Sequence, residues 1–272
     1  MLSVNTNTGA MVALQYLNQT QSQMTQVQNA INTGLKVATA KDNGAIYAIA
    51  QNMRGNIAGY AAVTDSLNRG SSVVDTAMSA AQSVSDLLIQ MKKNALAASD
   101  SSLDDASRAS LNDDFTAMAA QIDTIVNNAK FNDINLVDGT NPTGISALAS
   151  ASDPTQTITV AGVDLTSATL GVTAGFADKD EATAMVDTVN TAITNVNGAL
   201  SALSSGSKKF SIQADFVAKL SDTLTAGLGN LVDADMAKES ALLTSLQTKQ
   251  QLGIQALSIA NSAPSTILSL FK

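Results

Sequence analysis

The sequence predicts a mainly α-helical protein: a long antiparallel coiled-coil helical bundle formed by both chain ends, with a small β-rich outer lobe from the middle of the sequence. Two long stretches carry apolar residues at alternating steps of three and four, the spacing of a coiled-coil seam. The segment between them is rich in Ser, Thr and Gly and holds two of the three prolines. Aromatic residues make up only 3% of the 272 residues, which favours close-packed helices with aliphatic seams.

The N-terminal segment 1–35 is predicted to form an uncharged amphipathic helix. It contains no Asp, Glu, Lys or Arg, whereas the overall charged fraction of 14% predicts about five in that length. We expect Thr6 or Thr8 to be its N-cap and Gly34 to end it. Its polar face consists of Asn, Gln and Thr, and its apolar face is formed by Ala10, Leu14, Leu17, Met24 and Ile31.

The C-terminal segment repeats this pattern, since residues 250–271 are also free of charge. In a polymer of identical chains, a charge near the common axis meets its own copies at low dielectric, whereas a neutral amide does not. We therefore expect the two chain ends to pair with each other and then to pack against further copies. The residues expected to carry this self-assembly are Leu14, Leu17, Met24, Ile31, Leu242, Leu246, Leu252, Ala256, Ile259, Ala260, Leu268, Leu270 and Phe271.

Residues 36–45 break the apolar pattern and are expected to connect the first helix to the second. The segment 46–139 is then predicted to contain a long helix, a returning helix and a hairpin. Ser102 and Asp105 have the spacing of a capping box at the start of the returning helix. The long helix keeps its seam over seven heptads, through Ile46, Ile49, Met53, Asn56, Tyr60, Val63, Leu67, Gly70, Val74, Ala77, Ala81, Val84, Leu88, Met91, Ala95 and Ala98.

The returning helix is expected to pack along the same seam, and a hairpin should follow it at residues 130–139. Asn132-Asp133 and Asp138-Gly139 are the two candidate turns of this hairpin. Residues 140–178 are predicted to form the small lobe, where the β-branched alternation of 157–165 is typical of a strand.

Residues 179–226 resume the heptad pattern and predict a second long helix of the outer layer. Gly227 and Gly229 suggest a break, so 227–235 is expected to be a connector. The last segment, 236–272, is predicted to form the C-terminal inner helix and tail, with Asp233 or Asp235 as its cap. Its helix should end before Pro264, because proline removes a backbone donor from a helix interior.

Composition excludes several classes of function. A net charge of −8 and a pI near 4.4, without any cluster of Lys or Arg, argue against binding to nucleic acid or to anionic membranes. No His and no Cys are present, which removes imidazole and thiolate nucleophiles, Ser-His-Asp triads and the usual zinc ligands. No apolar run is long enough for a membrane helix. The first residues do not show a basic region followed by an apolar run, so we do not expect a cleaved signal peptide. We therefore expect a structural protein without enzymatic activity or cofactor.

An enzyme or metal-binding protein remains the alternative from another class, and it would have to use carboxylates. The densest acidic group consists of Asp104, Asp105, Asp113 and Asp114. These residues stand at the start and on the polar face of the returning helix, where carboxylates have an ordinary structural explanation.

Four short stretches resemble motifs of bacterial flagellins. Residues 39–45 read Thr-Ala-Lys-Asp-Asn-Gly-Ala, close to the Ser-Ala-Lys-Asp-Asp-Ala-Ala signature of that family. Residues 259–264 read Ile-Ala-Asn-Ser-Ala-Pro, similar to its Gln-Ala-Asn-Gln-x-Pro, and residues 267–271 resemble the Leu-x-Leu-Leu tail that follows. Phe131-Asn132-Asp133 stands where the family has Phe-Asn-Gly.

The resemblance covers about 1–140 and 180–272, and the short middle is similar to that of alphaproteobacterial flagellins. It implies a subunit that self-assembles into the helical flagellar filament for swimming motility. Its terminal helices would pair in a tubular inner core and become ordered on assembly, and the long helices would form a surrounding tube. A hook-filament junction protein, which has similar ends, is the alternative structural interpretation, and the intact tail motif favours flagellin.

The resemblance also implies partners and a location. The partners are further copies of the chain, sibling flagellins, the flagellar export apparatus with its chaperone, and the filament cap and hook-junction proteins. The location is extracellular, reached without a cleaved signal peptide. Gln90 and Asn94 replace an Arg and a Leu that an animal innate receptor recognises in many flagellins, so weak receptor activation is expected. Ser and Thr of the surface lobe are candidates for O-linked sugars, with a plain solvated surface as the alternative.

Overall fold

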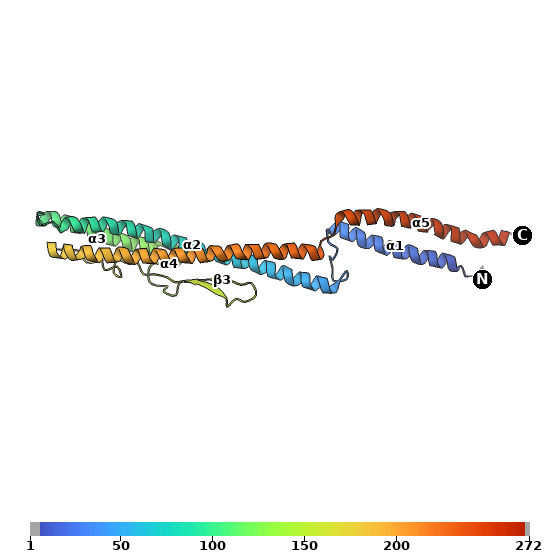
Figure 1. Cartoon of the computed structure of the whole chain (residues 1–272), viewed down its shortest axis with the longest axis horizontal. Helices are drawn as coiled ribbons and strands as arrows, with labels where there is room; N and C mark the ends of the chain where they lie inside the picture. Colours follow the sequence, from blue (N-terminus) through green and yellow to red (C-terminus); the bar gives the residue numbers. More distant parts are fainter. Residues whose placement is uncertain (1–5, 270–272) are drawn as a thin grey trace. The chain divides into compact units, whose positions relative to one another are not determined.

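The computed structural model describes residues 6–269 of the chain, and the side chains of residues 6–262. The chain divides into two compact units, which are described separately here: a terminal unit of Met1–Gly55 with Thr223–Lys272, and a central unit of Asn56–Asp222. Figure 1 shows the five helices of the described residues, which confirm the predicted mainly α-helical class. They are α1 (Thr8–Thr33), α2 (Gly44–Ala98), α3 (Asp105–Asn128), α4 (Lys179–Val232) and α5 (Met236–Ser269).

The core of the central unit runs between α2, α3 and α4. Every predicted seam position of α2 from Val63 to Ala98 is buried, so this part of the heptad prediction is confirmed. The seam of α4 is likewise buried from Ala182 to Val217, apart from the half-buried Gln213. Burial of aliphatic side chains at about 25 cal/mol per Å² is the main stabilising term for such a core. The central unit therefore buries its long apolar seams within one chain.

Helix α3 begins after a tight turn that a buried arginine closes. The Arg108 guanidinium donates to the carbonyl of Ala98 at 3.0 Å and to that of Asp100 at 3.2 Å, which caps the C-terminal end of α2 with a positive charge. The predicted capping box of Ser102 and Asp105 is wrong. Asp104 is the N-cap, because its side chain accepts from the Ser107 N–H at 3.0 Å, whereas Ser102 bonds to Asp100.

Two short antiparallel hairpins follow α3. The first pairs β1 (Lys130–Phe131) with β2 (Ile134–Asn135), and the second pairs β3 (Ile145–Leu148) with β4 (Thr157–Val160). Asn132 and Asp133 form the first turn, as predicted, with φ angles of 49° and 62°. Both residues thus adopt the left-handed conformation that a two-residue hairpin turn requires. The second hairpin belongs to the lobe, and β4 is shorter than the strand predicted over 157–165.

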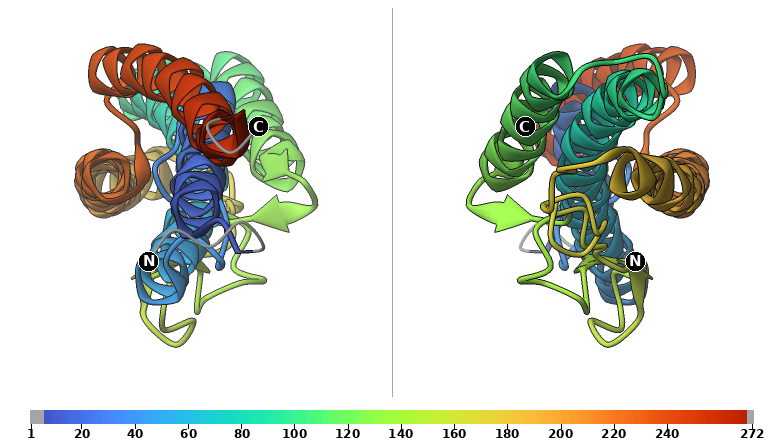
Figure 2. Two further views of the ribbon diagram at one scale, coloured as in Figure 1. Left: turned by 90° about the vertical axis from the view of Figure 1, so that its right-hand side faces the viewer. Right: turned by 90° about the vertical axis from the view of Figure 1, so that its left-hand side faces the viewer.

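The lobe lies beside the helices of the central unit (Figure 2). Polar contacts and a close approach at a glycine hold it there. The Leu148 N–H donates to Ser66 Oγ at 3.1 Å, and Gln213 Nε2 donates to the carbonyl of Ala149 at 2.8 Å. A Cβ atom at Gly206 of α4 would lie 2.6 Å from the side chain of Val160. Only glycine therefore lets β4 approach α4 this closely, which explains why the seam contains Gly206.

The end of α4 differs from its prediction. No break occurs at Gly227 or Gly229, since α4 continues to Val232 and the connector shrinks to residues 233–235. A glycine inside a helix costs only about 1 kcal/mol relative to alanine. Packing of Leu228 and Leu231 against the buried Val37, Ala50 and Val232 offsets that cost.

Helix α5 begins as predicted but does not end as predicted. The Asp235 carboxylate accepts from the backbone N–H groups of Ala237 and Lys238, which confirms Asp235 as the cap. The expectation that the helix ends before Pro264 is wrong, because α5 continues to Ser269. Proline leaves one carbonyl of the preceding turn without its usual backbone donor.

Candidate self-assembly surface

Helix α1 has a cap at each end, and the sequence placed only the C-terminal one correctly. Asn7 is the N-cap, with its side-chain oxygen accepting from the Ala10 N–H at 3.1 Å, so the prediction of Thr6 or Thr8 is wrong by one position. Asn, Thr and Ser are all good caps, and sequence alone does not choose among neighbours. Gly34 ends the helix as predicted, in a left-handed conformation with φ of 71°.

Helices α1 and α5 lie side by side and antiparallel within the terminal unit (Figures 1 and 2). Moving along α1 toward its C-terminus, the contacts on α5 move toward its N-terminus. Asn7 bonds to Ala260, a Leu17 methyl lies near Gly253, and Gln21 bonds to Gln250. Further on, Met24 and Val27 enclose Leu246 in a small buried cluster, with Ile31 and Leu243 packed against it. The predicted pairing of the two chain ends is therefore present within one chain.

This seam is thin and leaves most of both helices uncovered. Among the described side chains of α1 and α5, only those of Ala10, Met24, Val27 and Leu246 are buried. Large apolar side chains of the same helices are exposed: Met11, Val12, Leu14, Tyr16, Met236, Leu242, Leu252, Ile254 and Ile259. Single exposed apolar side chains are ordinary, but this many on one pair of helices is typical of a surface that another molecule covers.

The thirteen residues predicted for self-assembly fall into three groups. Leu17, Met24, Ile31 and Leu246 lie in the seam between α1 and α5, and Ala260 is half-buried beside Asn7. A second group faces away from that seam and is exposed, namely Leu14, Leu242, Leu252, Ala256 and Ile259. Leu270, Phe271 and the side chain of Leu268 lie outside the described residues.

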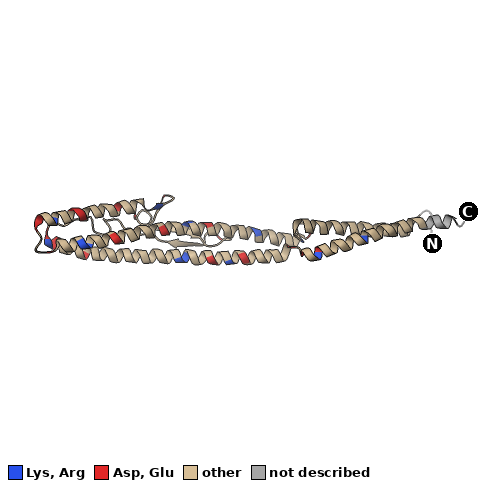
Figure 3. Cartoon of the chain, turned by 90° about the horizontal axis from the view of Figure 1, so that it is seen from above, with Lys and Arg blue, Asp and Glu red and all other residues tan. Residues whose placement is uncertain are grey.

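Sequence reasoning missed several residues of this surface. Met11, Val12 and Tyr16 of α1 and Ile254 of α5 are exposed apolar side chains that lie off the predicted apolar faces. The signal that pointed to them was the absence of charge around them, since an isolated helix exposing them would normally carry charged neighbours for solubility. In Figure 3, no residue of α1 has the colour of a charged side chain. The charges of α5 are Lys238 and Glu239 in its first turn and Lys249 well along the helix, and the described residues after Lys249 carry none.

A short ladder joins the two connectors at the base of α1 and α5. The Lys36 N–H donates to the Val232 carbonyl at 2.8 Å, and the Ala234 N–H donates to the Gly34 carbonyl at 2.8 Å. Lys36 Nζ also donates to the Asn230 carbonyl at 2.9 Å, close to the C-terminal end of α4. A cation at this position interacts favourably with the helix dipole. The two connectors therefore hold the start of α5 beside the end of α1.

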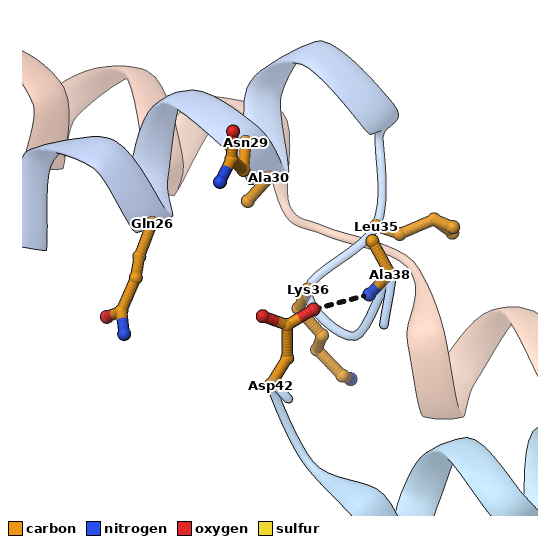
Figure 4. A pocket seen from close by; sticks show the side chains of 7 residues that line it. All are labelled: Gln26, Asn29, Ala30, Leu35, Lys36, Ala38 and Asp42. Carbon is orange, nitrogen blue, oxygen red and sulfur yellow. Dashed lines mark hydrogen bonds between the residues drawn. The ribbon is translucent and has the colours of Figure 1, made fainter. Parts of the chain in front are cut away.

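A pocket of about 160 Å³ lies beside this ladder, lined by Gln26, Asn29, Ala30, Leu35, Lys36, Ala38 and Asp42 (Figure 4). The Asp42 carboxylate accepts from the backbone N–H groups of Thr39 at 2.8 Å and Ala38 at 3.1 Å. The bond from the Thr39 N–H is the largest cause that lowers the pKa of Asp42 below its usual value. The ionised carboxylate therefore shapes the turn between α1 and α2.

Two of the four residues in the acidic group considered as an alternative site have structural roles. Asp104 caps α3, and Asp105 pairs with Arg108 at 3.5 Å between carboxylate and guanidinium. Within residues 6–269, no three side chains of His, Cys, Asp or Glu are grouped so that they could hold a metal ion. Over the same stretch of chain, no helix combines the length and the apolar character needed to cross a membrane.

Comparison with known proteins gives a consistent result along the whole chain. Residues 4–142 match the family described as the bacterial flagellin N-terminal helical region, and residues 186–271 match the bacterial flagellin C-terminal helical region. Flagellin FljM of Caulobacter vibrioides is 48% identical over 270 residues, covering 99% of this chain and 98% of that protein. A flagellin of Brucella melitensis is 34% identical over 284 residues, and flagellin C of Rhizobium meliloti is 31% identical over 323, each with full coverage of both chains.

Proposed function

The chain belongs to the bacterial flagellin family and is a structural subunit of the extracellular flagellar filament, and from this premise we propose that α1 and α5 carry the surface through which its copies assemble. The observation that carries this proposal is the coincidence of exposed apolar side chains and missing charge on α1 and on the part of α5 that follows Lys249. Scattered apolar side chains alone are ordinary on a protein surface, and a short uncharged stretch alone is not unusual. Together the two properties describe a surface suited to close contact with identical neighbours.

The proposal assigns different roles to the two sets of residues. Leu17, Met24, Ile31 and Leu246 hold the antiparallel pair together within one chain. Leu14, Leu242, Leu252, Ala256 and Ile259 contact neighbouring chains, and Met11, Val12, Tyr16 and Ile254 join them. Leu268, Leu270 and Phe271 extend the same uncharged segment. In this arrangement, residues 1–35 and 236–272 form the inner core of the filament. The tube around it is formed by the long helix, return helix and hairpin of 46–139 and by the long helix of 179–226.

Replacing one exposed leucine of this surface tests the assignment. Leu252 of α5 and Leu96 of α2 are both 58% exposed, so the change to serine removes the same side chain from equally exposed positions. If Leu252 is buried by neighbouring chains, Leu252→Ser should raise the subunit concentration needed for filament formation by about tenfold or more, whereas Leu96→Ser should raise it less. Sedimentation of filaments over a dilution series measures both. Equal effects from the two variants would argue against a dominant role for the terminal helices.

The remaining expectations concern partners and chemistry. The chain interacts with sibling flagellins, with the flagellar export apparatus and its chaperone, and with the cap and hook-junction proteins. It catalyses no reaction. The chain's similarity to five flagellins of one organism, at 42% to 48% identity, supports co-assembly with siblings. The flagellin names of the relatives favour a filament subunit over a hook-junction protein.

Two expectations about the surface stay predictions. Gln90 is exposed and Asn94 is half-buried on α2, and neither supplies the Arg or Leu that the innate receptor recognises. Purified monomer should therefore activate that receptor weakly, and a strong cellular response at low concentration would contradict this. Intact-mass spectrometry of native filament decides whether Ser and Thr of the lobe carry sugars.

A further inference from the structure

Pro264 lies inside α5 and deprives one carbonyl group of its usual hydrogen bond. In an α-helix the carbonyl of Ala260 accepts from the N–H of residue 264, but proline has no N–H. That carbonyl has another partner. The side-chain amide of Asn7 donates to it, with 2.7 Å between Asn7 Nδ2 and the Ala260 oxygen. A defect in one terminal helix is thus satisfied by a residue 253 positions away in the sequence.

The oxygen of the same side-chain amide also has a hydrogen-bond partner. Asn7 Oδ1 accepts from the Ala10 N–H at 3.1 Å and so caps α1. Because the oxygen is used by α1, only the NH₂ group is available to face α5, and the orientation of the amide is determined by its two partners. Asn7 therefore bonds to a backbone N–H in the first turn of α1 and to the Ala260 carbonyl of α5 at the same time. Both bonds can form only at one relative position of the two helices.

The other contacts between these helices are less selective. A leucine methyl against Gly253 and the cluster around Leu246 are apolar contacts, which a shift of one helical turn along the same stripe would replace with similar ones. A second polar contact in the seam joins two glutamines, since Gln250 Nε2 donates to Gln21 Oε1 at 2.7 Å. Polar pairs of this kind set the register of helices whose apolar contacts alone would tolerate slippage.

We propose that Asn7 is the positioning residue that sets the register of α1 on α5, by donating to the Ala260 carbonyl that Pro264 leaves without a backbone partner. This deepens the proposed function and rests on it, because a shifted register would displace the exposed apolar residues that each chain offers to its neighbours. The Gln21–Gln250 pair supports the same register from further along the seam.

A double-mutant cycle tests the pairing of Asn7 with the proline gap. Serine is as good an N-cap as asparagine but has no amide to reach α5, so Asn7→Ser keeps the cap and removes the contact. We expect it to raise the subunit concentration needed for filament formation roughly three- to tenfold. Pro264→Ala restores the backbone donor to the Ala260 carbonyl. In the Pro264→Ala chain, Asn7→Ser should raise the subunit concentration needed for filament formation by less than about twofold. The Ala260 carbonyl then accepts from the backbone N–H of residue 264 and no longer depends on Asn7.

Cross-linking reads the register directly and uses the full chain, which contains no cysteine of its own. The pair Gln21→Cys and Gln250→Cys places two thiols at positions whose native side chains are in contact. In the pair Gln21→Cys and Ile254→Cys, the second thiol lies one helical turn further along α5. Both pairs remove the glutamine contact, so Asn7 is left to set the register. A short bis-maleimide should bridge the first pair within one chain much better than the second, and Asn7→Ser should shift the ratio toward the second by threefold or more.

The outcomes separate this inference from the function it rests on. If the unsubstituted chain assembles but Asn7→Ser changes neither the assembly concentration nor the cross-linking ratio, Asn7 does not set the register. The proposal would also be overturned if Asn7→Ser raised the assembly concentration equally with and without the Pro264→Ala change. Asn7 would then act only as the N-cap of α1. If instead the unsubstituted chain forms no filament while the cross-linking ratio still responds to Asn7→Ser, the register assignment stands and the proposed assembly surface fails.

Discussion

The terminal and central units bury their apolar residues to very different extents. In the central unit, seam residues of α2 and α4 are buried at almost every heptad position, and charged residues lie on the polar faces. In the terminal unit, the pair α1 and α5 buries four described side chains and leaves nine large apolar ones exposed, with no charge on α1. The central unit therefore buries its apolar seams within one chain, and the terminal pair leaves exposed the surface that we propose other chains cover.

The strongest test of this difference removes the N-terminal segment. Deleting residues 1–35 takes away all of α1 but no residue of the central core, which extends from Val63 to Val217. We expect filament formation to be abolished, while the helical circular-dichroism signal and cooperative melting of the central unit remain. Electron microscopy at high protein concentration checks the first part and a thermal scan the second. Normal filaments from the shortened chain would contradict the account.

The next largest effect should come from adding charge to the terminal surface. Ile259 of α5 is 71% exposed and Ile212 of α4 is 70% exposed, so Ile259→Lys and Ile212→Lys place the same charge at equally exposed positions. Two like charges about 10 Å apart at an effective dielectric of 20 repel by about 1.7 kcal/mol. Ile259→Lys should therefore weaken assembly by at least about tenfold, more than Ile212→Lys does, and the loss should shrink in high salt.

Equal losses from these two lysine variants would show that charge is no more costly at the chain ends than elsewhere. Ile259→Gln supplies the neutral control, since it removes the same apolar side chain without adding charge. Its effect on assembly should lie between that of the unsubstituted chain and that of Ile259→Lys. The neutrality argument fails if Ile259→Gln is as harmful as Ile259→Lys.

Truncating one buried leucine in each unit should produce two different phenotypes. Leu246→Ala and Leu88→Ala both remove a fully buried side chain, a change that typically costs roughly 2–5 kcal/mol in a packed core. In the central unit, Leu88→Ala should lower the melting temperature of the monomer. In the thin seam of the terminal pair, Leu246→Ala should leave that melting temperature nearly unchanged and raise the assembly concentration instead. Calorimetry of the monomer and filament sedimentation distinguish the two.

The smallest expected effect concerns pH and the connector of the terminal unit. The folded-state pKa of Asp42 is lowered, chiefly by the Thr39 N–H, so its carboxylate stabilises the turn fully above the unfolded pKa of about 3.9. That contribution is lost as the pH falls through the lower, folded pKa. Asp42→Asn should make filaments slightly less stable at neutral pH and reduce the part of their acid sensitivity that lies below about pH 4. An unchanged acid profile in this variant would assign that sensitivity to other carboxylates.

The sequence predicts some features of this protein well because they depend on local pattern. The heptad spacing from Val63 to Ala98 corresponds to burial within one chain, and the left-handed turn at Asn132-Asp133 follows from turn chemistry. The charge-free ends likewise predicted a pair of terminal helices. In each case the determining residues are neighbours in sequence or repeat with a regular period.

Other features were not predictable, because they depend on contacts between distant segments. The helix continues through Gly227 because the surrounding aliphatic cluster stabilises it, and no local signal reports that cluster. Helix α5 continues through Pro264 where the carbonyl of Ala260 has a partner in Asn7, at the opposite end of the chain. Leu252 and Ile259 were correctly placed on one helical face, but sequence alone did not show that this face lies away from α1.

A density map of the assembled filament at side-chain resolution would show directly whether the terminal helices form its inner core. We expect α1 and α5 innermost around the filament axis, with Leu14, Leu252 and Ile259 buried against neighbouring copies and no charged side chain among them. A map that places these helices on the outside, with the same three side chains in contact with solvent, would contradict this expectation.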